Sequence, residues 1–305
     1  MLTYTILALG LFALFVGGDL LVKGASGLAL RFGLSPMVIG LTIVGFGTST
    51  PELLVSLNAA LGGQAGIAIG NVVGSNIANT LLILGVAAVL APIAVPFATL
   101  RRDLFWLVVA TLVLPVVFWS GSLGLIEGLA LVGGLIVFLV VSLRGGGQTD
   151  DVVPFTGTVW RSAGFALGGL AAVMAGAHYL VQSATLIARD FGISEAMIGL
   201  SIVAIGTSLP ELATTIVAVL RGQRDIALGN VIGSNIFNVL GILGITALIT
   251  PIPVATRFVQ IDTPFLIVLT LAVVAILWLS SKLGRVAGVL MLVVYAGYLT
   301  ATAGI

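Results

Sequence analysis

The chain has 305 residues, of which 59% are apolar and only 8% are charged, and its formal net charge is +1. A soluble globular protein carries roughly 25% charged residues, so this composition excludes a water-covered fold and disfavours disorder or nucleic-acid binding by a basic face. Because cysteine is absent, disulfides, thiolate metal sites and cysteine nucleophiles are excluded. Forty glycines in so apolar a chain are typical of closely packed membrane helices, and we predict an all-α polytopic membrane protein.

Ten segments are long and apolar enough to form membrane-spanning helices, which need about 20 apolar residues each. Charged residues, glycines and prolines separate these segments, which lie at 4–29, 36–61, 65–90, 103–119, 122–143, 159–188, 195–220, 225–248, 262–280 and 285–303. The first segment carries no positive charge before Lys23, so it predicts a first span rather than a cleaved signal peptide. The longest connection, 144–157, has the glycine-rich and polar composition of a flexible linker.

The distribution of positive charge predicts the orientation of the spans, because short cytoplasmic loops are enriched in lysine and arginine. If the N-terminus lies outside, the outer ends of the spans hold only Arg189 and Arg257. The cytoplasmic ends then hold Lys23, Arg31, Arg101, Arg102, Arg144, Arg161, Arg221, Arg224, Lys282 and Arg285. We therefore predict a multi-pass protein of the cell (inner) membrane whose N- and C-termini are both extracellular or periplasmic.

Two motifs occur twice, at a constant offset of 159 residues. Residues 40–53 (GLTIVGFGTSTPEL) match 199–212 (GLSIVAIGTSLPEL) at ten of fourteen positions, and 70–85 match 229–244 at twelve of sixteen. Each half holds five spans, so the second copy enters the membrane from the opposite side. Two inverted repeats with a site at their interface are a recurring transporter architecture. We predict a first five-helix repeat at 1–143, a cytoplasmic linker at 144–157 and a second five-helix repeat at 158–305.

Glutamates Glu52 and Glu211 lie deep inside the second and seventh predicted spans. Burying a carboxylate at this depth costs at least roughly 2.5–3.5 kcal/mol on insertion scales, so such a residue marks an ion pathway or a proton relay. Neither motif contains a lysine or arginine that would neutralise the carboxylate. The missing countercharge is most simply a bound cation.

The residues before each glutamate favour the same interpretation. Pro51 and Pro210 lack the N–H that would bond the carbonyl four residues back. The carbonyls around 47–48 and 206–207 therefore need other partners in a medium without water. Hydroxyl oxygens one turn from the glutamates come from Thr48, Ser49, Thr207 and Ser208. Carboxylate, carbonyl and hydroxyl oxygens are the ligands that hard cations such as Na⁺ and Ca²⁺ take.

The second motif, GNxxGSNIxN, falls near the start of the third and eighth spans. Ser75 and Asn79 are four residues apart and share one helix face, as do Ser234 and Asn238. The glycines of this motif allow close approach of neighbouring backbones. Four further asparagines are equally compatible with hydrogen bonds between helices and with ion ligation, namely Asn71, Asn76, Asn230 and Asn235.

The duplicated GTSxPE and GNxxGSNxxN motifs resemble the α-repeats of the cation/Ca²⁺ exchanger superfamily, most closely those of its prokaryotic sodium/calcium exchangers. The resemblance covers both halves and implies ten helices, with Na⁺ and Ca²⁺ competing for sites between helices two, three, seven and eight. It implies that Glu52 and Glu211 are the principal ligands of both ions, and that Thr48 and Thr207 supply main-chain carbonyls. It further implies flanking Na⁺ ligands at Ser49, Ser75, Ser208 and Ser234, and a centre lined by Asn79 and Asn238.

The chain departs from this family pattern at the centre of the site. Several members carry aspartate at one of the positions matched by Asn79 and Asn238, whereas both residues are neutral here. In the K⁺-dependent branch an aspartate at the position of Asn238 is associated with K⁺ transport, so this chain resembles the K⁺-independent members. The formal charge of −2 matches one Ca²⁺ or two Na⁺, and it leaves the usual three-to-one exchange an open question.

We predict a secondary antiporter that exchanges Na⁺ for Ca²⁺ by alternating access, in which the packing surface of the short first and sixth helices slides against the core. The closest alternative is a H⁺-coupled exchanger of Ca²⁺ or another divalent cation, and a cation channel is a further one. A single histidine, no cysteine and no nucleophile–base set in the motifs argue against an enzyme. The expected partners are Na⁺, Ca²⁺ and the lipid bilayer, with no cofactor, no nucleic acid and no obligate protein partner.

Overall fold

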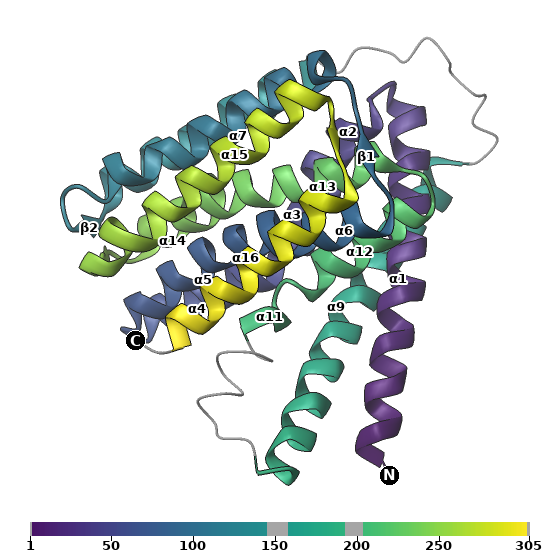
Figure 1. Cartoon of the computed structure of the whole chain (residues 1–305), viewed down its shortest axis with the longest axis horizontal. Coiled ribbons are helices and arrows are strands. Elements are labelled where there is room, and N and C mark those ends of the chain that lie inside the picture. Colours follow the sequence, from purple (N-terminus) through teal and green to yellow (C-terminus); the bar gives the residue numbers. More distant parts are fainter. Residues whose placement is uncertain (1, 145–157, 193–203, 304–305) are drawn as a thin grey trace.

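The computed structural model describes residues 2–144, 158–192 and 204–303, and helices make up most of this part of the chain (Figure 1). The predicted linker beyond Arg144 lies outside the described residues, as does the first part of the predicted seventh span, 195–203. The prediction of a helical, polytopic membrane class is confirmed by the structure.

The first half of the chain contains ten helical elements, in which η denotes a π-helical turn. They are α1 (Leu2–Phe32), α2 (Pro36–Ile39), η1 (Gly40–Val44), α3 (Gly45–Thr48), α4 (Thr50–Leu61), α5 (Ala65–Ala78), η2 (Asn79–Ile83), α6 (Leu84–Leu90), α7 (Phe97–Val117) and α8 (Leu125–Arg144). The described residues of the second half contain α9 (Val159–Asp190), α11 (Ala204–Gly206), α12 (Leu209–Leu220), α13 (Arg224–Ile236), η4 (Phe237–Leu243), α14 (Gly244–Ile249), η5 (Phe258–Asp262), α15 (Thr263–Ser280) and α16 (Arg285–Ala303).

Within the described ranges, seven helices are long and apolar enough to cross a membrane, and the bent pair Pro36–Thr48 with Thr50–Leu61 raises the number to eight. The helix boundaries lie within a few residues of the predicted spans, and the largest difference is at α7, which begins at Phe97 instead of 103. Asp103 inside this helix is 1% exposed and accepts a hydrogen bond of 2.9 Å from Arg102.

Helices α1 and α9 lie side by side and extend together beyond the rest of the bundle (Figure 1). They are 31 and 32 residues long, so the prediction that the first and sixth helices are short is wrong. Glycines allow their close contact: a Cβ atom on Gly17 would lie 2.7 Å from the Val173 nitrogen. Close backbone packing of this kind holds helices together in lipid, where burial of apolar side chains provides no driving force.

Four two-residue strands, which the prediction of an all-α chain did not include, join the two halves at the ends of helices. β1 (Ile93–Ala94) pairs antiparallel with β4 (Lys282–Leu283), and β2 (Ser122–Leu123) pairs antiparallel with β3 (Ile252–Pro253). In each strand one residue is buried and its neighbour is exposed or half-buried. The paired strands lie far apart in the sequence, so local pattern alone does not reveal the pairs.

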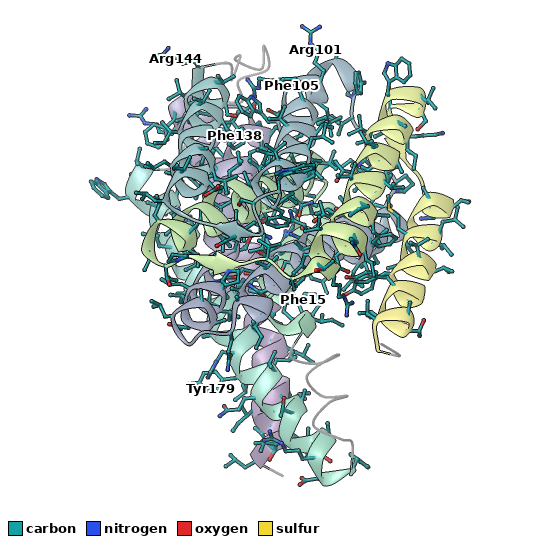
Figure 2. The ribbon with its side chains drawn as sticks, turned by 90° about the vertical axis from the view of Figure 1, so that its left-hand side faces the viewer. Phe15, Arg101, Phe105, Phe138, Arg144 and Tyr179 are labelled. Carbon is teal, nitrogen blue, oxygen red and sulfur yellow. The ribbon has the colours of Figure 1, made fainter. Side chains whose placement is uncertain are left out.

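The two ends of the molecule differ in charge. Figure 2 shows Arg101 and Arg144 at one end, and the N-terminus of α1 lies at the opposite end (Figure 1). Both arginines belong to the set predicted to face the cytoplasm.

Candidate functional site

The duplicated GTSxPE motif interrupts a helix in each half of the chain. In the first half, α3 ends at Thr48 and α4 begins at Thr50, with a bend of 44° between the two parts of the span. The Ser49 N–H donates to the Gly45 carbonyl and the Leu53 N–H to the Ser49 carbonyl, but Pro51 has no N–H for the Gly47 carbonyl. The predicted interruption by proline is therefore present.

The second half repeats this break between α11 and α12. The Ser208 N–H donates to the Ile205 carbonyl at 3.1 Å, and the Leu212 N–H donates to the Ser208 carbonyl at 3.0 Å. Pro210 leaves the Gly206 carbonyl without its α-helical donor. Each break places a glutamate in the first turn of the helix that follows it.

The two glutamates lie in the interior, and each is contacted by the opposite half of the chain. Glu52 and Glu211 are each 1% exposed. The Ser49 hydroxyl donates to Glu211 Oε1 at 2.9 Å, and the Ser208 hydroxyl donates to Glu52 Oε1 at 3.3 Å. The two motifs, 159 residues apart in the sequence, thus form one site.

Neither carboxylate is neutralised by a basic side chain within the described part of the chain. The ion pairs there involve Asp19, Asp103 and Asp262, and none involves either glutamate. The second oxygen of each carboxylate, Glu52 Oε2 and Glu211 Oε2, is buried and has no hydrogen-bond partner among these residues. A buried carboxylate oxygen without a partner costs free energy that a bound cation would recover.

The asparagines of the second motif contribute two further oxygens of this kind. Asn79 is the first residue of η2 and Asn238 lies in η4, so both occupy π-helical turns, which often occur at functional sites. The Asn79 amide nitrogen donates to Asn235 Oδ1 at 3.0 Å, and that of Asn238 donates to Asn76 Oδ1 at 2.9 Å. The Oδ1 atoms of Asn79 and Asn238 are buried without a partner in the described structure.

Asn71 and Asn230 donate hydrogen bonds to the backbone carbonyls of the two glutamates. Asn71 Nδ2 donates to the Glu52 carbonyl at 3.0 Å and to the Ser56 hydroxyl at 2.9 Å. Asn230 Nδ2 makes the equivalent bonds, to the Glu211 carbonyl at 3.2 Å and the Thr215 hydroxyl at 2.9 Å. Hydrogen bonds between helices, one of the two roles left open for these asparagines, are therefore present.

The sequence prediction does not include the Ser56 and Thr215 hydroxyls. They are repeat-equivalent residues, each four positions after its glutamate, so this spacing is the signal that could have found them.

The other predicted site residues differ in their hydrogen-bond partners. Thr48 Oγ1 lies 3.0 Å from its own helix at the Val44 carbonyl and 3.1 Å from Asn230 Oδ1, and Ser234 donates to the Gly45 carbonyl at 3.1 Å. Thr207 Oγ1 is buried without a partner among the described residues. Ser75 is buried on α5, one helical turn before Asn79.

The site therefore presents oxygen atoms of several kinds and a formal charge of −2 in the interior of a membrane protein. Oxygen ligands of this kind suit hard cations. The arrangement defines a class, a multi-pass membrane protein with an acidic, oxygen-lined site where its two halves meet.

Comparison with known proteins specifies the family within this class. Residues 2–144 and 161–304 match the family model described as "Sodium/calcium exchanger protein". The chain belongs to this family, which confirms the resemblance inferred from the motifs.

Relatives of similar length are found in bacteria and archaea. The sodium/calcium exchanger MaX1 of Methanosarcina acetivorans is 34% identical over 97% of this chain and 97% of its own length. The inner membrane protein YrbG of Escherichia coli is 37% identical over 95% and 94%, respectively. A solved structure of the sodium–calcium exchanger NCX_Mj superposes with a TM-score of 0.88 at 32% identity, covering 98% of both chains.

Proposed function

We propose that this chain is a secondary antiporter, not an enzyme, that exchanges Na⁺ for Ca²⁺ by alternating access. The observation that supports this function most strongly is the set of buried oxygens without a partner in the described structure, Oε2 of Glu52 and Glu211 and Oδ1 of Asn79 and Asn238. These atoms come in repeat-equivalent pairs from both halves of the chain. The names of MaX1 and NCX_Mj as sodium/calcium exchangers indicate which cations such a site takes in this family.

In this proposal Glu52 and Glu211 are the ligands that Na⁺ and Ca²⁺ share. The carbonyls of Thr48 and Thr207 complete their coordination, and flanking Na⁺ ions use the hydroxyls of Ser49, Ser75, Ser208 and Ser234. Asn79 and Asn238 line the centre. The two ions displace each other because both need the same two carboxylates, and an empty dianionic site would be costly to occlude in low dielectric.

We further propose that the chain has ten spans arranged as two inverted five-helix repeats, at 1–143 and 158–305. Contacts between repeat-equivalent residues support this arrangement, since Thr111 Oγ1 and Thr270 Oγ1 lie 3.4 Å apart at an offset of 159 residues. The exchanged serine–glutamate hydrogen bonds support it as well. The charge count and the name of YrbG support the inner membrane, with both termini outside.

The direct test is ⁴⁵Ca²⁺ uptake into proteoliposomes at a fixed membrane potential. The vesicles are loaded with Na⁺, with K⁺, or with neither ion, and in the third case a proton gradient is imposed. We expect uptake only when Na⁺ is inside, because Na⁺ leaving the vesicle must drive Ca²⁺ in. Since both central residues are neutral asparagines, vesicles loaded with K⁺ in place of Na⁺ are expected to take up no more ⁴⁵Ca²⁺ than the background. Empty vesicles from the same lipid provide the background.

Each other outcome would assign a different function. Uptake driven by the proton gradient without Na⁺ would identify a H⁺-coupled exchanger. Uptake along the Ca²⁺ gradient alone, with no counter-ion, would identify a cation channel. Either result would overturn the proposed exchange.

A further inference from the structure

Two asparagines that were not assigned to the ion site, Asn76 and Asn235, connect its central residues across the two halves. Asn238 Nδ2 donates to Asn76 Oδ1 at 2.9 Å, and Asn79 Nδ2 donates to Asn235 Oδ1 at 3.0 Å. Each central asparagine is thus held by an asparagine from the opposite repeat. Asn76, Asn79 and Asn235 are at most 2% exposed and Asn238 is fully buried, so water does not compete for these bonds.

A backbone carbonyl determines the direction of the first of these bonds. Asn76 Nδ2 donates to the Asn235 backbone carbonyl at 3.1 Å, and a carbonyl oxygen can only accept. The other end of the Asn76 amide, its oxygen, therefore faces Asn238. Because an oxygen acceptor requires a donor opposite, Asn238 presents its nitrogen to Asn76, and its own Oδ1 is left without a partner in the described structure.

In the second bond, between Asn79 and Asn235, the amide nitrogen of Asn235 is bonded to a hydroxyl instead of a backbone carbonyl. Asn235 Nδ2 donates to Thr80 Oγ1 at 3.1 Å, which leaves Asn235 Oδ1 to accept from Asn79. The repeat-equivalent position of Thr80 is Val239, which has no hydroxyl. A hydroxyl can accept or donate, so this contact holds the Asn235 amide in place, whereas the carbonyl also sets the direction of the Asn76 amide.

We propose that Asn76 and Asn235 are positioning residues that hold the amide oxygens of Asn238 and Asn79 toward the bound ion. Without them an amide can rotate by half a turn and present its N–H₂ group, which repels a cation and can donate to a glutamate. The inference rests on the proposed function, because it matters only if a cation occupies the centre. Outer residues that orient metal ligands typically change metal affinity by 10–100-fold when they are replaced.

The test is the variant Asn76→Leu, with ⁴⁵Ca²⁺ uptake measured over a range of Ca²⁺ concentrations. We expect the KM for Ca²⁺ to rise by roughly 10–100-fold while the rate at saturating Ca²⁺ falls much less. Bound Ca²⁺ should also raise the unfolding temperature of the detergent-solubilised protein. The Ca²⁺ concentration that gives half of the maximal rise should increase by the same factor in the variant, and this measurement does not depend on transport. Thr111→Val, which removes a buried hydroxyl contact outside the site, is the matched control and should leave KM unchanged.

The decisive comparison uses Asn238→Asp, because a carboxylate has two oxygens and no nitrogen end to be turned. A carboxylate at this position offers no N–H to Asn76 Oδ1 and has no amide to orient. In that background, adding Asn76→Leu is therefore expected to change KM by less than about twofold, the scatter within which independent effects add. If Asn76→Leu raises KM equally in both backgrounds, or in neither, the positioning role is wrong.

A second variant keeps the inference testable if Asn76→Leu fails to fold. Thr80→Val frees Asn235 and introduces the residue that the other repeat carries at this position. It should raise KM by about fivefold, the equivalent of one hydrogen bond of about 1 kcal/mol, and an unchanged KM would contradict the inference. Glu52→Gln distinguishes a failure of the proposed ion site from a failure of the positioning role. If Glu52→Gln retains uptake, the proposed ion site itself is wrong. If Glu52→Gln loses uptake but the Asn76 and Thr80 variants keep the wild-type KM, only the positioning role is wrong.

Discussion

Replacing either Glu52 or Glu211 with glutamine is expected to abolish Na⁺-driven ⁴⁵Ca²⁺ uptake. The substitution keeps the size of the side chain but removes one negative charge, so the formal charge of the site changes from −2 to −1. At about 4 Å and an effective dielectric constant of about 20, one unit charge pair contributes about 4 kcal/mol, and about twice that for Ca²⁺. Losing one carboxylate therefore lowers Ca²⁺ affinity by several orders of magnitude, and uptake should fall to that of empty vesicles.

The matched control for the glutamate variants is Glu127→Gln. Glu127 accepts a hydrogen bond of 2.9 Å from the Gly124 N–H at the start of α8 and takes no part in the proposed site. It should keep wild-type uptake, and all three variants should elute as the wild type does in size-exclusion chromatography. Wild-type flux in a protein that combines Glu52→Gln, Glu211→Gln and Asn238→Ala would rule out the site.

A large loss of stability is expected for Gly229→Ala in α13. A Cβ atom on Gly229 would lie 2.6 Å from the Met37 carbonyl oxygen and 3.0 Å from both Gly40 Cα and the Leu41 nitrogen. All three are backbone atoms, so no side chain can rotate away and the two helices must separate. Overpacking typically costs about 1–3 kcal/mol, and we expect a cost at the upper end of this range. Thermal unfolding in detergent, followed by tryptophan fluorescence, measures the loss.

Gly134→Ala in α8 is the control for this packing prediction. Its Cβ atom would lie 3.7 Å from Leu240 Cδ2, an ordinary van der Waals distance. Because alanine favours a helix by up to about 1 kcal/mol over glycine, this variant should be as stable as the wild type or more so. Equal unfolding temperatures for the Gly229 and Gly134 variants would show that the close approach of α13 to the Met37–Leu41 segment does not limit stability.

Much of the candidate site could be predicted from the sequence, because the bilayer limits what a polar residue can do. Glu52 and Glu211 have no basic partner in their motifs, and Pro51 and Pro210 interrupt the helices beside them. In lipid each of these features requires compensation, and the proposed shared cation would provide it for both motifs. The offset of 159 residues then pairs the two halves without any knowledge of their contacts.

Other features depend on contacts between residues that are far apart in the sequence. Whether Asn76 and Asn235 are ligands or hydrogen-bond partners could not be decided from the motif, since an asparagine offers both a donor and an acceptor. The start of α7 at Phe97 was not predicted either, because the predicted span began after the charged residues Arg101 and Arg102. Arg102 lies inside the helix, where its guanidinium donates to Asp103. The four short strands pair only across the two halves.

Composition was sufficient to determine the membrane class, because so few charged residues cannot cover a water-facing surface. The resemblance of the repeated motifs was sufficient to identify the family, and the two glutamates were predicted as site residues because an unpaired carboxylate is costly in lipid. The tertiary structure alone decided that Ser49 donates to Glu211 and Ser208 to Glu52, and that the amide oxygens of Asn79 and Asn238 are left without a partner in the described structure. A hydrogen-bond direction depends on which donor lies opposite which acceptor, and only the packing of one half of the chain against the other brings those atoms together.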